Sequence, residues 1–279
     1  MSCPRPAATA ADRGRVVLTR ALLRATIVLA TILVLACSDE GAALAATPPA
    51  GTPTATTFSG VPYVGALFRH GLTKPHGCSA SVVRSARRNI VLTAAHCVYG
   101  TGAGLRFAPG YVDGRTPYGV WTVTRTWVAT PWKVTRDQHY DYAFLEVATA
   151  KNGKRVQDVT GGAVLGGAPS AGDTVRGVAY QHGIKDRPVQ CTNKIVYTGD
   201  YPTFNCHGYV GGVSGSPLLV SHPNAPTMVV GLIGGLRQGG CYEWNSFSSP
   251  FRSRIKGTFQ RASNGSFSDR VPSAGSSGC

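Results

Sequence analysis

The apolar residues of this chain fall into short, evenly spaced segments separated by glycine, proline and polar residues, a pattern typical of β-strands. A Gly-rich stretch at 161–172 divides these segments into two sets. The first set lies at 61–68, 78–83, 89–93, 120–128 and 141–147, and the second at 174–180, 194–197, 203–206, 216–220, 228–235 and 244–247. This count predicts an all-β protein of two packed six-stranded antiparallel barrels, at 61–155 and 156–262.

One helix is predicted near the end of the second barrel. Phe251, Ile255 and Phe259 repeat at intervals of four residues and give one apolar stripe. Ser249 can cap such a helix and Pro250 suits its first turn. The residues that follow, 263–279, are rich in serine and glycine, which predicts a flexible tail.

The N-terminal residues have the pattern of an export signal. Arginines precede an apolar run at 25–36 that is too short to span a bilayer, and the small residues at 43–45 offer a cleavage site. We therefore expect 1–45 to be a signal peptide and the protein to be secreted. The alternative is a lipobox at 34–37, in which lipidation of Cys37 would anchor the protein to a membrane. Residues 46–60, rich in Thr, Pro and Ala, read as a linker or short propeptide.

Three segments carry residues suited to acyl transfer, in the order His, Asp, Ser. His96 lies in Thr-Ala-Ala-His-Cys, Asp141 precedes an apolar run, and Ser214 lies in Gly-Val-Ser-Gly-Ser-Pro. A serine hydroxyl is a weak nucleophile, so it needs an imidazole to take its proton and a carboxylate to orient that imidazole. Asp137 is the rival for the carboxylate. Asp141 is preferred because the apolar residues after it would bury its side chain beside the imidazole.

These segments resemble those of the chymotrypsin-like serine peptidases, in which the three residues have this order. The resemblance covers about 60–262 and implies that Ser214 attacks the scissile carbonyl, His96 is the general base and Asp141 orients it. It also implies an oxyanion hole formed by the backbone N–H groups of Gly212 and Ser214. The family pattern around the serine is Gly-Asp-Ser-Gly-Gly-Pro, from which Val213 and Ser216 depart. Valine cannot pair with a new N-terminus after zymogen cleavage, so activation must differ from that of the animal enzymes.

The family alignment also indicates the specificity pocket. Its base falls near Gly208 and Tyr209, and one wall at Gly234, Gly235 and Leu236. No acid is among these five residues, which disfavours a preference for Arg or Lys before the cut bond. The Ser-Gly-Ser-Pro ending is similar to that of bacterial glutamyl endopeptidases, but Ile233 stands where their carboxylate-binding histidine would fall. We expect a preference for medium or large apolar residues, with Glu specificity as the alternative.

Six cysteines remain after the predicted signal, an even number that fits an oxidising compartment. The resemblance implies that Cys78 pairs with Cys97, which should stabilise the fold by about 3 kcal/mol. Cys191 is expected to pair with Cys206, and this leaves Cys241 and Cys279 by elimination. A zinc site of Cys78, His96 and Cys97 is the rival explanation, but it lacks paired C-x-x-C spacing and would consume the base.

Charge and composition limit the classes of molecule that we expect this protein to bind. The chain has 28 basic and 13 acidic residues, a net charge of +15, and without residues 1–45, which hold five basic and three acidic residues, it is 23 minus 10, or +13. The basic residues are spread along the chain without a basic-aromatic motif, so we expect peptide substrates, no nucleic acid, no cofactor and a monomer.

A lipase-type elbow is disfavoured because a strand follows Ser214. The remaining alternative is a catalytically silent secreted protein that binds cell walls or mediates adhesion.

Overall fold

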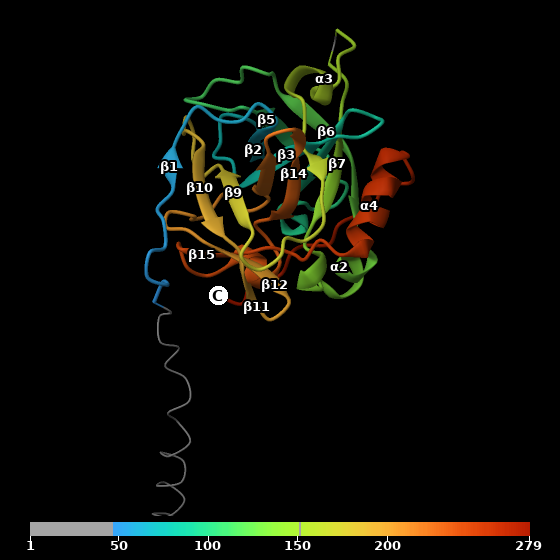
Figure 1. Ribbon diagram of the computed structural model, residues 1–279. Coiled ribbons are helices and arrows are strands. Elements are labelled where there is room, and N and C mark those ends of the chain that lie inside the picture. Colours follow the sequence, from blue (N-terminus) through green and yellow to red (C-terminus); the bar gives the residue numbers. More distant parts are fainter. Residues whose placement is uncertain (1–46, 151) are drawn as a thin grey trace, which may run out of the picture. The chain divides into compact units, whose positions relative to one another are not determined.

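Six strands of the N-terminal half close into an antiparallel barrel (Figure 1). The computed structural model describes residues 47–150 and 152–279, so the expected signal peptide and the lipobox at Cys37 lie outside the described residues. In barrel order the strands are β2 (Val64–Phe68), β3 (Cys78–Val83), β4 (Ile90–Thr93), β7 (Ala143–Val147), β6 (Trp121–Val128) and β5 (Arg106–Pro109). Every residue of β2, β4 and β7 is buried, which explains why these strands are apolar except at Thr93 and Glu146.

Strands of the C-terminal half form two sheets. One contains, in order, β1 (Thr56–Thr57), β10 (Val189–Lys194), β9 (Thr174–Ala179), β13 (Pro217–His222), β14 (Ala225–Leu232) and β8 (Val164–Leu165). The other contains β11 (Val196–Thr198), β12 (Tyr201–Asn205) and β15 (Asn245–Phe247). An isolated bridge between Ile233 and Ser248 and the Cys191–Cys206 disulfide are among the contacts that join the two sheets.

The all-β prediction is confirmed, with differences in detail. The second half is not one six-stranded ring, because β1 and β8 extend one sheet at its edges, and β8 runs parallel to β14. In the first half, none of the predicted segments corresponds to β5. This strand has four residues and includes Arg106 and Pro109, so it gives almost no apolar signal.

The helices are short. They are α2 (Thr130–Thr135), α3 (Val156–Thr160) and α4 (Ser253–Ser263), with 3-10 turns η1 (Ala95–Cys97), η2 (Gln138–Tyr140) and η3 (Leu236–Gly239). The predicted C-terminal helix is α4, and the ring of Phe259 packs 5.3 Å from that of Phe144 on β7. Ser249 does not cap it: Arg252 is the N-cap residue, and the Ser249 hydroxyl donates instead to the carbonyl of Gln138 at 3.1 Å.

Both ends of the unit Pro48–Cys279 are held to its body. Residues 48–60 lie along the second half, where β1 pairs with β10 and the N–H of His207 donates to the Pro53 carbonyl. After α4, Val271 exchanges two backbone hydrogen bonds with Gly100, and Cys279 is joined to Cys241. The three disulfides are the expected pairs. Among 47–150 and 152–279, no helix is long and apolar enough to cross a membrane.

Candidate active site

His96 lies in η1, directly after β4 of the first barrel. The strand is fixed on both sides by β3 and β7, and the Thr93 hydroxyl at its end donates to the Ser79 carbonyl at 2.8 Å. The next residue, Cys97, is linked to Cys78 at the start of β3. The turn that carries the imidazole is therefore held by a sheet at one end and by a disulfide at the other.

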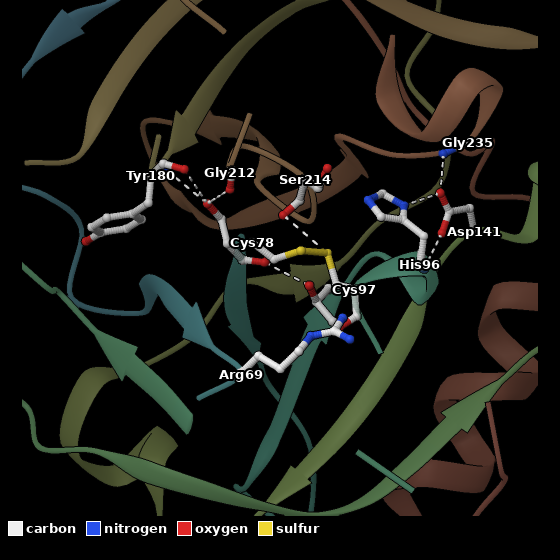
Figure 2. Close-up of a disulfide and its surroundings, with 11 residues drawn as sticks. Arg69, Cys78, His96, Cys97, Asp141, Tyr180, Gly212, Ser214 and Gly235 are labelled. Atoms are coloured by element: carbon white, nitrogen blue, oxygen red, sulfur yellow. Dashed lines mark hydrogen bonds and ion pairs between the residues drawn. A yellow bond between two sulfur atoms is a disulfide. The ribbon is translucent and has the colours of Figure 1, made fainter. Parts of the chain in front are cut away.

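The carboxylate of Asp141 is buried, with 0% of its surface exposed, and accepts three hydrogen bonds. Its Oδ1 accepts from the backbone N–H of His96 at 2.9 Å, and its Oδ2 lies 2.7 Å from His96 Nδ1 and accepts from the N–H of Gly235 at 2.9 Å (Figure 2). Such donors replace the hydrogen bonds to water that a buried carboxylate has lost. Because the Asp141 carboxylate accepts a hydrogen bond at Nδ1 of His96, the imidazole carries its proton on that nitrogen. Nε2 is then free to accept a second proton.

Asp137, the rival for this position, faces a different histidine. Its Oδ1 accepts from the backbone N–H of His139 at 3.0 Å and lies 2.9 Å from Nδ1 of the same residue. The His139 ring stacks on Tyr201, with 4.5 Å between ring centroids. The structure thus brings Asp141, and not Asp137, to His96.

Ser214 lies in the loop between β12 and β13, beside the disulfide. Its carbonyl accepts from the N–H of Ser79 on β3 at 2.7 Å, so the serine loop of the second half is tied to the first barrel. Figure 2 shows Ser214 and the His96 ring next to each other above the Cys78–Cys97 bridge, and both line the same pocket.

Two backbone N–H groups beside Ser214 are free of hydrogen-bond partners within the described part of the chain. The Gly211 carbonyl accepts from His182 N at 2.6 Å and the Val213 carbonyl accepts from Ser216 N at 2.9 Å. In a trans peptide the N–H points opposite to the carbonyl, so the N–H groups of Gly212 and Ser214 face away from these partners. The expected oxyanion-hole donors are therefore unengaged and fixed in direction.

Gly212 must be glycine for this arrangement. Its φ is +97°, and a Cβ there would lie 2.1 Å from His182 N. Gly215, on the other side of the serine, has φ +83°, and a Cβ there would lie 2.2 Å from the Thr93 hydroxyl. The loop approaches neighbouring backbone too closely for any side chain at either position.

A pocket of about 340 Å³ is lined by Ser214 but not by His96. Of the five residues expected to form the specificity pocket, Tyr209 lines it, whereas Gly208, Gly234, Gly235 and Leu236 do not. Gly235 instead donates to Asp141, and Leu236 begins η3. The residues that line the 340 Å³ pocket are Tyr209, Val210, Gly211, Val213, Ser214, Ile233, Gln238, Gly239, Gly240, Cys241, Tyr242, Glu243, Asn245 and Ser246.

The carboxylate residue in this lining, Glu243, was not assigned to the site from sequence. Its Oε2 accepts from the N–H of Gly208 at 2.6 Å, and its Oε1 lies 2.7 Å from His207 Nδ1. These two donors lower the pKa of the Glu243 carboxyl below its usual value, the Gly208 N–H contributing most. Glu243 follows Cys241 in a loop without periodicity, so no sequence pattern connected it with Gly208.

A second pocket, of about 370 Å³, lies on the His96 side of Ser214. Its lining residues are Leu67, Arg69, Gly77, Cys78, His96, Cys97, Leu105, Gly211, Gly212 and Ser214. The ligand atoms of Cys78, His96 and Cys97 lie within 4.8 Å of one another, as the zinc alternative requires. Both sulfurs are joined in the disulfide, however, so neither is a thiolate that could bind zinc.

Comparison with known proteins identifies the family and the fold of this chain. The family model described as Trypsin matches residues 51–248. Among solved structures, the protease Anisep from Arthrobacter nicotinovorans superposes with a TM-score of 0.65 at 22% identity, covering 76% of this chain and 100% of that one. The thermostable serine protease AL20 from an extremophilic microorganism gives 0.62 at 23% identity, covering 73% and 97%. A Glu endopeptidase gives 0.59 at 16% identity, covering 77% and 98%. No curated protein matches the chain. At these identities the structural matches show the fold alone, the chymotrypsin-like fold expected from the sequence.

Proposed function

Because the chain belongs to the trypsin family and is a serine endopeptidase, we propose that it hydrolyses peptide bonds through Ser214, His96 and Asp141. The observation that carries this assignment is the buried Asp141 carboxylate, which holds both the backbone N–H and Nδ1 of His96. This contact leaves Nε2 of His96 free to act as the base. His96 and Ser214 line the same pocket.

The reaction follows from these positions. Ser214 Oγ attacks the scissile carbonyl carbon while His96 Nε2 takes the hydroxyl proton. The N–H groups of Gly212 and Ser214 donate to the oxyanion that forms, and losing one such donor typically costs about 3 to 4 kcal/mol. The imidazolium then gives its proton to the departing amine, which leaves an acyl-enzyme on Ser214. A water molecule, activated by the same nitrogen, hydrolyses the ester and restores the serine.

Labelling tests the nucleophile. A fluorophosphonate should modify Ser214 with a stoichiometry near one, and Ser214→Ala should abolish labelling and lower turnover by roughly a million-fold. Ser216→Ala is the matched control, because Ser216 lies two residues away but is buried with 0% exposure. Label on Ser216, or full activity in Ser214→Ala, would contradict the mechanism. A protein that takes no label would instead fit the silent adhesion or cell-wall-binding alternative.

For the residue before the cut bond we propose a medium or large apolar side chain. Val213, Ile233 and the Tyr209 ring offer apolar surface in the 340 Å³ pocket, and burying such a side chain contributes about 1.5 to 3 kcal/mol. Glu specificity lacks support, because Ile233 lines the pocket and the nearby His207 is engaged by Glu243.

A second candidate preference, for Lys or Arg, is favoured by the Glu243 carboxylate in the pocket lining. A peptide library separates the two. Apolar residues should dominate the cleavage profile of both the native protein and Glu243→Gln. A native profile dominated by Lys or Arg that Glu243→Gln removes would overturn the apolar proposal.

We also propose that the enzyme is secreted, since its three disulfides suit an oxidising compartment. N-terminal sequencing of the exported protein should find a start close to residue 46. A mature N-terminus at a lipidated Cys37 would show a membrane-anchored form instead.

A further inference from the structure

Arg69 brings a positive charge to the pocket on the His96 side of Ser214. It follows β2 directly, and its side chain extends toward Cys97 beside the disulfide (Figure 2). Among the residues that line this pocket, Arg69 is the permanently charged one, and none is an acid. A peptide bound here therefore meets a cation with no carboxylate next to it.

The guanidinium is anchored but retains most of its donors. Its Nη2 donates to the Cys97 carbonyl at 3.1 Å, and Arg69 forms no ion pair with any acid in 47–150 or 152–279. An arginine has five N–H donors in a planar fork, so four remain for another acceptor. Unpaired arginines are common in a chain with 28 basic and 13 acidic residues. What distinguishes Arg69 is its anchoring to the residue that follows His96.

The position of His96 shows which part of a substrate enters this pocket. His96 lines the 370 Å³ pocket and is absent from the lining of the other one. In the proposed mechanism the imidazolium protonates the departing amine, so the residues after the cut bond lie on its side. Successive residues of an extended peptide are about 3.3 to 3.6 Å apart. Because Ser214 and Arg69 line the same pocket, we expect the first or second residue after the cut bond to lie near Arg69.

We propose that Arg69 is a specificity-determining residue that binds a carboxylate on the first or second residue after the cut bond. The planar fork suits a carboxylate, which can accept two parallel hydrogen bonds from it. The carboxylate can belong to an Asp or Glu side chain or to the C-terminus of the substrate. This inference rests on the proposed function, because it takes the direction of the bound peptide from the roles of Ser214 and His96.

Quenched fluorescent peptides test the inference. One series carries Asp, Asn, Glu or Gln at each of the two positions after the cut bond, with an amidated C-terminus. A second series has neutral residues there and ends one or two residues after the cut bond, as free acid or amide. The native enzyme should show kcat/KM about tenfold or more higher for the acid than for its matched amide in at least one series. Preference in the first series identifies a side chain as the source, and preference in the second identifies the C-terminus.

Variants connect this ratio to the guanidinium. Arg69→Gln should bring the acid-to-amide ratio close to one, and Arg69→Lys should retain part of it because the charge remains but the fork is lost. Lys256→Gln removes the same charge from the exposed face of α4 and should keep the native ratio. Thermal unfolding of each variant shows that it is folded, so a changed ratio is not a folding defect.

Two results would overturn the proposal: a native ratio near one in both series, or an Arg69→Gln ratio equal to the native one. Fluorophosphonate labelling of Ser214 separates this failure from that of the mechanism. Normal labelling and Ser214-dependent cleavage of neutral peptides without an acid preference reject the role of Arg69 alone. Absence of labelling and cleavage rejects the proposed function, and the role of Arg69 with it.

Discussion

The backbone N–H of Gly235 donates to Asp141 Oδ2 at 2.9 Å, the same oxygen that holds His96 Nδ1. Asp141 and His96 belong to the first barrel, whereas Gly235 follows β14 of the second half. One buried carboxylate therefore connects the two halves at the candidate active site. It also explains why Gly235, expected in the specificity pocket, lies behind the imidazole instead.

Replacing Gly235 should damage both stability and turnover. Its φ is +80°, and a Cβ would lie 2.8 Å from Ser249 N, so Gly235→Ala forces the backbone away from Asp141. A loss of about 1 to 3 kcal/mol in the free energy of unfolding is expected in urea, together with a lower kcat. Gly167→Ala is the control, because nothing lies within 4 Å of its Cβ position. Equal behaviour of the two variants would contradict the role of the Gly235 N–H.

Asp141→Asn should keep the fold and lower turnover by about 10⁴-fold, because an amide can donate to Nδ1 and favour the wrong imidazole tautomer. Asp137→Asn should cost little turnover, since Asp137 contacts His139 rather than His96. Steady-state kinetics of the two variants measure the difference. A crippled Asp137→Asn with an active Asp141→Asn would reverse the assignment of the orienting carboxylate.

Many of the features that were predictable from sequence are encoded by nearby residues. The fully buried strands β2, β4 and β7 appear as largely apolar runs, and the turn with His96 carries its own motif. The family resemblance supplied some contacts between distant residues, such as Cys78 with Cys97 and Asp141 with His96. Other contacts between distant residues were not predictable. The Ser249 hydroxyl has the chemistry of a helix cap, but the structure places the Gln138 carbonyl within its reach.

The same limit applies to the C-terminal residues and to Glu243. The composition of 263–279 predicts flexibility, whereas Asp269 accepts from Lys133 Nζ at 2.7 Å and from Arg261 Nη2 at 2.8 Å. These contacts link residues separated by up to 136 positions, for which no local pattern exists. Glu243 reaches the N–H of Gly208, 35 residues away, for the same reason.

Loss of the Cys241–Cys279 disulfide should affect stability and substrate binding together. It closes a loop of 38 residues, for which the chain-entropy model gives about 4 kcal/mol, and Cys241 lines the 340 Å³ pocket. Cys241→Ser/Cys279→Ser should therefore unfold at lower urea and raise KM more than it lowers kcat. The double variant Cys191→Ser/Cys206→Ser serves as comparison, because neither of its cysteines lines that pocket. An unchanged KM in the first variant would show that the bridge stabilises the fold without shaping the pocket.

Acid should weaken the contact between Glu243 and Gly208. The pKa of Glu243 is lowered in the folded protein, first by the Gly208 N–H and then by His207. A lowered folded pKa contributes stability above the unfolded value of about 4.3, and this contribution is lost as the pH falls through the folded pKa. The effect is small because the carboxylate is half exposed and screened by water. Glu243→Gln should thus have a lower Tm than the native protein near neutral pH, and the difference should shrink below about pH 4.

Asp113→Asn provides the matched control for this pH dependence. The Arg187 guanidinium, which donates to both Asp113 carboxylate oxygens at 2.9 Å, likewise lowers the pKa of Asp113. The Tm difference between the native protein and Asp113→Asn should likewise shrink as the pH falls. The cleavage profile of Asp113→Asn should stay native because Asp113 lines neither pocket beside Ser214. The profile of Glu243→Gln should also stay dominated by apolar residues, so a change seen in Glu243→Gln alone would show that this carboxylate, which lines the 340 Å³ pocket, contacts the substrate. A Tm difference for Glu243→Gln that grows as the pH falls would show that the folded protein binds the protonated carboxyl more favourably, contrary to the hydrogen bonds that hold it.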